Sequence, residues 1–169
     1  MSALTNVDVR AVRAQLGRPP RDAVRVAHRC PCGNPDVVAT APRLADGTPF
    51  PTFYYLTCPR AVAKIGTLEA SGLMKQMTER IGVDSPLADR YRRAHAAYLA
   101  ARAEHGHVPE IEGLSAGGMP DRVKCLHALV AHSLATGPGA NPLGDEALAM
   151  VGPWWREGPC VRVDEGDTA

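Results

Sequence analysis

The sequence lacks an excess of charge of either sign. Its 169 residues include 19 Lys and Arg against 18 Asp and Glu, which gives a formal net charge of +1. Without a strong positive field, the chain offers no electrostatic signal for binding nucleic acid or an anionic membrane. Hydrophobic residues make up 45% of the chain and charged residues 22%, which excludes a disordered chain and predicts one domain with a core of its own.

Long apolar runs are also missing. No window approaches the roughly 18 consecutive apolar residues of a membrane-spanning helix. The first 20 residues, MSALTNVDVRAVRAQLGRPP, lack the apolar stretch of a secretory signal. We therefore expect a cytoplasmic protein. Five cysteines in that reducing compartment do not make a disulfide framework, and their odd number agrees with this expectation.

Several common catalytic signatures are absent as well. The chain has no phosphate-binding GxxxxGK motif, no dinucleotide-binding GxGxxG motif and no GxSxG nucleophile elbow. The cysteines and histidines are therefore the strongest chemical signal in the sequence.

The first third of the chain predicts a small β-sheet. Between about residues 23 and 57, three short segments are rich in β-branched and aromatic residues and are separated by turns that contain Gly, Asn, Asp and Pro. They are expected to form a three-stranded antiparallel sheet, with strands at 23–28, 36–41 and 52–57.

Helical periodicity follows the predicted sheet. After Cys58, apolar residues recur near every 3.6 positions, which predicts a bundle of four to five helices packed on the sheet. The whole pattern indicates an α+β fold. The clearest helix lies near 86–105, and its expected inner face consists of Leu87, Tyr91, Ala94 and Tyr98.

The expected organisation has three parts. Residues 1–20 form an N-terminal helix, residues 21–152 form a single α+β domain, and residues 153–169 form a polar, flexible tail.

Four cysteines occupy turns or helix starts. Cys30 and Cys32 lie in a predicted hairpin turn, Cys58 lies where a strand passes into a helix, and Cys125 lies in the first turns of another helix. The free N–H groups and dipole of a helix start stabilise a thiolate, which is the form that binds metals. Cys-x-Cys is less diagnostic of a metal site than Cys-x-x-Cys.

The same cysteines have other interpretations. Free Cys is often simply buried, and a thiolate beside a base can instead be a catalytic nucleophile. Cys160, near the tail, is expected to be incidental. In a regular helix Cys125 and His127 point about 200° apart, so they converge only if Cys125 lies in a loosened first turn. His132 lies roughly 10 Å along the axis from Cys125, too far to share one zinc ion.

Four motifs carry a resemblance to a known family. The stretches CPCGNPDVV, GTPFPTFYYLTCP, GGMPDRVKCLHALVAHSLATG and NPLGD resemble the domain-of-unknown-function family 501, a bacterial family prominent in actinobacteria, from about residue 25 to 150. The resemblance implies that these segments belong to one domain. Genes of this family lie near those for a septum-formation initiator, enolase and an exopolyphosphatase in some actinobacteria. This association suggests a protein partner linked to cell division, or a role in phosphate metabolism.

With the resemblance added, we expect a metal site. Its core is Cys30, Cys58 and Cys125, with Cys32 or His127 as the fourth ligand. Zinc suits a mixed Cys and His set, an iron–sulfur cluster is the alternative, and a metal-free chain stays open. A closed four-ligand site predicts a structural or binding-module role.

An enzyme is the alternative function. An open metal or cluster position, or a metal-free nucleophile at Cys58 or Cys125, would then act on a small substrate, anionic in one version of this hypothesis. The residues expected around such a pocket are His132, Arg60, Arg122, Asn141 and Asp145.

Overall fold

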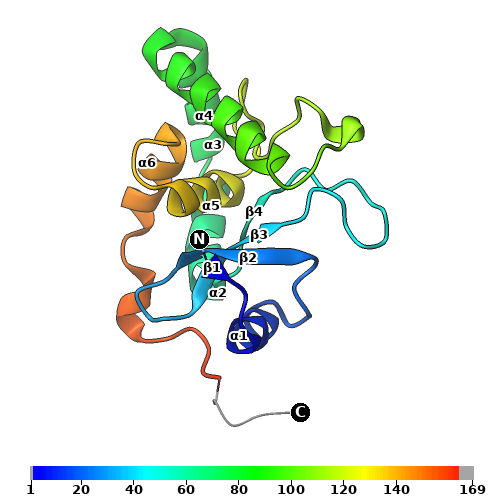
Figure 1. Ribbon diagram of the computed structural model, residues 1–169. Coiled ribbons are helices and arrows are strands. Elements are labelled where there is room, and N and C mark those ends of the chain that lie inside the picture. The colour runs from blue at the N-terminus through cyan, green and yellow to red at the C-terminus, as the bar shows by residue number, and fades with distance from the viewer. Residues whose placement is uncertain (1, 164–169) are drawn as a thin grey trace.

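The computed structural model describes residues 2–163 and shows an α+β fold (Figure 1). Its described part has a four-stranded sheet and six α-helices, where three strands and four to five helices were predicted. Two short 3₁₀-helices, η1 and η2, complete it. In chain order the elements are β1 (Ser2–Ala3), α1 (Asn6–Leu16), β2 (Ala23–Arg29), β3 (Pro35–Thr40), β4 (Tyr54–Leu56), α2 (Pro59–Ala70), α3 (Leu73–Val83), α4 (Ser85–Ala103), η1 (Pro109–Ile111), α5 (Leu126–Thr136), α6 (Pro142–Val151) and η2 (Trp154–Glu157).

The sheet is antiparallel, with strand order β1-β2-β3-β4. Every residue of β3 is buried, because β3 is an inner strand covered on both faces. Strand β1 was not predicted. It has only two residues, which is too short for an alternating pattern, and it exists because Ser2 and Ala3 pair with the outer edge of β2.

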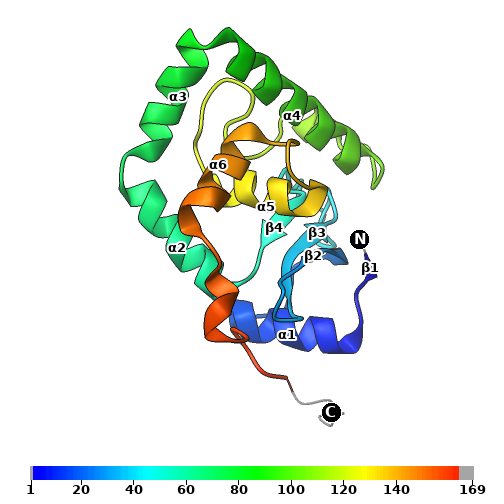
Figure 2. The same ribbon diagram turned by 90° about the vertical axis from the view of Figure 1, so that its left-hand side faces the viewer.

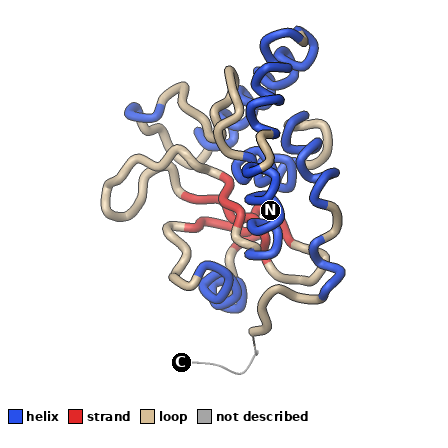
Figure 3. The backbone as a smooth tube through the Cα atoms, turned by 180° about the vertical axis from the view of Figure 1, so that it is seen from behind, coloured by secondary structure: helices blue, strands red, loops and turns tan. Residues whose placement is uncertain are grey.

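The helices form two layers around the sheet. Helix α1 packs against one face, while α5 and α6 lie on the other side (Figure 1). Helices α2, α3 and α4 follow one another in an arc outside α5 and α6 (Figure 2). Seen from behind, the strands lie at the centre of the molecule between these helices (Figure 3). No helix within residues 2–163 has the length and apolar character needed to cross a membrane.

Helix α4 buries the face that the sequence predicts. Leu87, Tyr91, Ala94 and Tyr98 are all buried. The hydroxyl of Tyr98 accepts hydrogen bonds from the backbone N–H groups of Phe53 and Tyr54, at 2.6 and 3.2 Å. One helix side chain thereby fixes the start of β4.

Two side chains of α4 hold the long connection between α4 and α5. The buried Arg102 donates to the carbonyl oxygens of Pro51, Ile111 and Leu114 at 2.6–3.0 Å. The hydroxyl of Tyr91 donates to the carbonyl oxygen of Arg122 at 3.0 Å. The connection is therefore anchored at several points along its length.

The segment after α6 packs on the body of the protein as far as it is described. Trp154, in η2, is 3% exposed. Further along, Arg60 donates to the carbonyl oxygen of Gly158, and Asn34 Nδ2 donates to that of Val161 at 2.9 Å. The last six residues of the expected tail, 164–169, lie outside the described residues.

Candidate functional site

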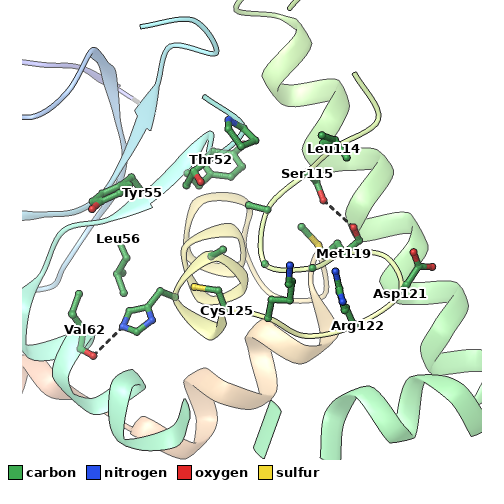
Figure 4. A pocket seen from close by; sticks show the side chains of 18 residues that line it. Thr52, Tyr55, Leu56, Val62, Leu114, Ser115, Met119, Asp121, Arg122 and Cys125 are labelled. Atoms are coloured by element: carbon green, nitrogen blue, oxygen red, sulfur yellow. Dashed lines mark hydrogen bonds between the residues drawn. The ribbon is translucent and has the colours of Figure 1, made fainter. Parts of the chain in front are cut away.

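A cleft of about 730 Å³ lies between β4, the loop before α5 and the start of α5. Thr52, Tyr55 and Leu56 line one side of it, and most residues of the loop from 114 to 124 line the other (Figure 4). Cys125, at the start of α5, and Val62, on α2, also line it. The cleft thus combines segments that lie up to 77 positions apart in the sequence, from Pro51 to Ala128.

Cys125 is the N-cap residue of α5. Its backbone is extended, with φ −155° and ψ 111°, and the helix begins only at Leu126. The condition that the sequence set for Cys125 and His127 to converge is therefore met. Because Cys125 stands before the first helical residue, its side chain is not held on the opposite side of the helix from His127.

Two glycines let the loop approach α5. Gly117 and Gly118 have φ values of +72° and +92°, which favour glycine. A Cβ atom at Gly117 would lie 2.9 Å from Leu129 Cδ2 and 3.1 Å from the carbonyl oxygen of Cys125. The two glycines of the GGMP motif therefore have a steric role, because the absence of a side chain lets the loop lie directly against α5 and Cys125.

Glu69, Cys125 and His127 form a cluster. One ligand atom from each lies within 4.8 Å of the others. His127 Nδ1 lies 3.0 Å from Glu69 Oε1, and the backbone N–H of Leu126 donates to the same oxygen at 2.7 Å. His127 Nε2 lies 3.2 Å from the carbonyl oxygen of Val62. The last turn of α2 and the first turn of α5 are joined through these contacts.

His127 is an imidazolium in this arrangement. A carbonyl oxygen only accepts, and Glu69 Oε1 already accepts from a backbone N–H, so both ring nitrogens of His127 face acceptors. The pKa of His127 is raised to about 9, mainly by a hydrogen bond with Cys125. Burial lowers this pKa, and the hydrogen bond with Glu69 raises it further. A cation thus sits next to a thiol at the start of a helix.

Two further cations border the cleft. Arg122 and Lys124 line it, and both are exposed. Asp121 also belongs to the lining, but Figure 4 shows it at the far end of the loop from Cys125, pointing away. Near the thiol, these two cations and the imidazolium of His127 outnumber the one carboxylate of the cluster, Glu69.

The structure does not bring all the predicted metal ligands together. Within residues 2–163, the group of three or more Cys, His, Asp or Glu side chains with ligand atoms this close is the Glu69 cluster, which lacks Cys30, Cys32 and Cys58. A shared site of Cys30, Cys58 and Cys125 is therefore not assembled. Cys58 precedes α2, whereas Glu69 lies 11 residues later in its last turn, roughly 16 Å along the axis.

The other thiols pair near the opposite end of α2. Cys30 and Cys32 interact within the hairpin turn, and burial raises the pKa of Cys30 to about 12. Cys58 hydrogen-bonds with Cys160, and this bond, together with burial, raises the pKa of the Cys58 thiol. Cys160, expected to be incidental, is thus the sulfur partner of a predicted ligand.

Of the predicted pocket residues, Arg122 lines the cleft and the others serve elsewhere. His132 is fully buried and stacks on Tyr54, and Asn141 Nδ2 donates to its Nδ1 at 3.3 Å. Burial lowers the pKa of His132 to about 4, so the ring is neutral at pH 7. Asp145 accepts from the backbone N–H of Gly139 at 2.7 Å. Arg60 donates to the carbonyl oxygen of Gly158, as described above.

The NPLGD motif closes the packing of α5 against α6. Asn141 caps α6 by accepting from the N–H of Gly144, and a Cβ atom at Gly144 would lie 2.3 Å from the carbonyl oxygen of Leu129. The motif is explained by close helix packing and not by contact with the cleft.

Glu69 was missed by the sequence analysis. It lies 56 positions from Cys125, and no spacing rule connects them. One local signal exists. A carboxylate in the last turn of a helix is unfavourable for the helix dipole, so its presence there calls for a nearby cation, which His127 supplies.

The chain matches the family described as protein of unknown function (DUF501) over residues 26–149. The chain belongs to this family. Glu69, Cys125, His127 and the whole cleft lie inside the DUF501 region, whereas Gln15, Trp154 and Cys160 lie outside it. No curated protein and no solved structure matches the chain.

Proposed function

We propose that this DUF501 protein is a thiol-dependent enzyme with Cys125 as its nucleophile. The observation that carries the proposal is the cluster of Glu69, His127 and Cys125 at the start of α5, open to a cleft of about 730 Å³. A thiol beside an imidazole at the start of a helix is an arrangement that nucleophilic cysteines use.

Each member of the cluster has a role in a substitution at an electrophilic carbon. The sulfur of Cys125 forms a bond to that carbon, the bond to the leaving group breaks, and His127 can supply the proton that the leaving group takes. Water then displaces the sulfur and returns the proton. Glu69 holds the ring of His127 and stabilises its charge.

The substrate proposed for this site is a small anion. Arg122 and Lys124 border the cleft, whereas the charge of the His127 imidazolium is paired with the carboxylate of Glu69. Cations that surround a low-dielectric concave surface attract and orient carboxylate or phosphate groups. The cytoplasmic location and the division-linked partner expected from the sequence stay predictions.

Alkylation with two reagents of similar size tests this function without a known substrate. Iodoacetate is an anion and iodoacetamide is neutral, so the ratio of their rates at one thiol reports the local charge. On reduced, chelator-treated protein, we expect a ratio at Cys125 several-fold higher than at Cys32, which is also partly exposed. Peptide mass spectrometry measures both rates at both sites.

Variants assign the effect to residues. The double change Arg122→Ala and Lys124→Ala should lower the ratio at Cys125 several-fold and leave the iodoacetamide rate unchanged. His127→Gln should slow both reagents at Cys125 by about tenfold or more. Lys75→Ala removes a cation that is 85% exposed on α3 and should change neither quantity. Equal reactivity of Cys125 and Cys32 toward both reagents would refute the proposal.

A metal site is the second candidate, because the same three side chains are potential ligands. Zinc accepts a carboxylate, a thiolate and an imidazole, and catalytic zinc sites hold three protein ligands with a fourth position for water or substrate. An iron–sulfur cluster fits less well, since the cluster offers one thiolate. In this candidate His127 gives up a ring proton to become a ligand.

Metal analysis separates the two candidates. Protein purified without oxygen is analysed for zinc and iron and by UV–visible spectroscopy. Stoichiometric zinc that disappears in Glu69→Gln and Cys125→Ser, and persists in Cys58→Ser, would favour the metal site. Protein without bound metal but with the alkylation behaviour described above would favour the nucleophile.

A further inference from the structure

A second thiol pair, formed by Cys58 and Cys160, lies away from the cleft. Cys58 is the N-cap residue of α2 and is 1% exposed. Cys160 belongs to the segment after η2, is partly exposed, and hydrogen-bonds with Cys58. The two residues are 102 positions apart, so their contact depends on tertiary structure alone.

Three parts of the fold position Cys160. From α1, Gln15 Nε2 donates to Cys160 Sγ at 3.4 Å and to the carbonyl oxygen of Pro35 at 2.7 Å. From the hairpin turn, Asn34 Nδ2 donates to the carbonyl oxygen of Val161 at 2.9 Å. The sulfur of Cys160 is therefore held in place by α1, by the hairpin and by the thiol of Cys58.

The donors around Cys160 stabilise its thiolate. The hydrogen bond from Cys58 has the largest effect on the pKa of Cys160, which lies at about 6. Gln15, Asn34 and the backbone N–H of Val161 act in the same direction, and together with the bond from Cys58 they outweigh burial. At neutral pH the pair consists of a thiolate at Cys160, next to solvent, and a buried thiol at Cys58.

We propose that Cys160 and Cys58 form a hydroperoxide-reactive pair, in which Cys160 is oxidised first and Cys58 then closes a disulfide. The Cys160 sulfur attacks the outer oxygen of the peroxide and the O–O bond breaks, which leaves a sulfenic acid; the alkoxide or hydroxide released takes a proton and departs as alcohol or water. The sulfur of Cys58 then attacks the sulfenic sulfur, and water leaves with the hydroxyl group and the thiol proton. The peroxide is the oxidant throughout.

The disulfide would fasten the C-terminal segment to the start of α2. It closes a loop of about 100 residues, and cross-links over long loops remove much conformational entropy from the unfolded chain. The oxidised protein should therefore melt several degrees above the reduced protein. The pair shares no residue with the Cys125 cluster, so this inference stands independently of the proposed function.

Equimolar hydrogen peroxide on the reduced full-length protein tests the pair. We expect loss of two hydrogens by intact mass, and a cross-linked peptide that joins Cys58 to Cys160, which reducing agent releases. In Cys58→Ser, Cys160 should stop at a sulfenic acid that dimedone traps. In Cys160→Ser, Cys58 should be oxidised at least tenfold more slowly.

Controls decide between this pair and the other thiols. Cys32→Ser removes the thiol that neighbours Cys30 and should leave the rate of the Cys58–Cys160 disulfide unchanged. A disulfide between Cys30 and Cys32 formed first, or oxidation of Cys160 no faster than that of Cys32, would overturn the proposal. Serine differs little in size from cysteine, and circular dichroism of each variant verifies folding before the reaction is scored.

Discussion

The charge of His127 links the candidate site to the stability of the fold. The pKa of this imidazole is raised to about 9 in the folded protein, from an ordinary value near 6.5, by its contacts with Cys125 and Glu69. A raised pKa means that the folded state binds the proton more tightly. The stabilisation is therefore complete below pH 6.5 and is lost as the pH rises through 9.

We predict that His127→Gln removes this pH dependence. On metal-free protein, the wild type should exceed the variant by roughly 1–2 kcal/mol more at pH 6 than at pH 9.5. The range is discounted because the His127 side chain is 26% exposed. Urea unfolding of both proteins at both pH values measures the difference. The same difference at both values would mean that the ring is neutral or that its contacts do not form in solution.

At the same scale, the sequence predicts part of the site. It identifies Cys125 and His127 and states the condition for their meeting, because helix geometry is local. It cannot identify Glu69 as a contact of Cys125 or Cys160 as a contact of Cys58, since both contacts are made across the tertiary fold. Arg122 lines the cleft, whereas His132 and Asn141 are buried in the core.

The start of α5 shows how tertiary contacts override helical periodicity. The sequence places Cys125 within the first turns of a helix, but α5 begins only at Leu126. Apolar spacing continues through Val123, so periodicity gives no sign of a boundary. Contacts to other helices fix the preceding turn: the backbone N–H of Val123 donates to Thr78 Oγ1 at 3.0 Å, and that of Leu126 donates to Glu69. These bonds replace helical ones and leave Cys125 extended.

The glycine loop against α5 makes a second prediction. Gly117→Ala should destabilise the protein by about 2–4 kcal/mol, through the strain of a positive φ and the clash of the new Cβ with Leu129. Gly113→Ala is the matched control, because its φ is +70° but nothing lies within 4 Å of the added Cβ. It should cost about 1–2 kcal/mol.

The two glycine variants should also differ in the reactivity of Cys125. Displacement of the loop in Gly117→Ala should change the alkylation rate at Cys125, whereas Gly113→Ala should preserve it. Chemical unfolding and the alkylation assay provide both readouts. Equal losses of stability in the two variants would show that α5 shifts to accommodate the new Cβ at little cost and that the close approach of the loop is not required.

For the whole molecule, the structure divides one predicted site between the two ends of α2. The shared metal site assumed that motif cysteines meet, yet Cys125 contacts the last turn of α2 while Cys58 stands before its first turn. The α+β class and the inner face of α4 were predictable because periodicity reports burial. Which helix ends meet was not, because that depends on how α2, α3 and α4 curve around the core (Figure 2).

Packing contacts extend beyond both the family region and the predicted domain 21–152. Before residue 21, helix α1 buries Ala11 and Val12 against the sheet, and after residue 152, Trp154 is buried as well. A fragment of residues 21–152 loses these contacts and also exposes Cys58, which the segment around Cys160 covers.

We therefore predict that the fragment 21–152 melts at least about 10 °C below the full chain. Truncation of one buried Trp alone costs about 3–5 kcal/mol, and in a protein of this size each kcal/mol shifts the melting temperature by several degrees. A chain of residues 1–163 is the control and should melt close to the full-length protein. Circular dichroism melting measures all three. If the fragment unfolds as cooperatively and at the same temperature as the control, α1 and the segment after α6 are appendages of an independent core. Their contacts with Cys58 and β3 would then contribute little to folding.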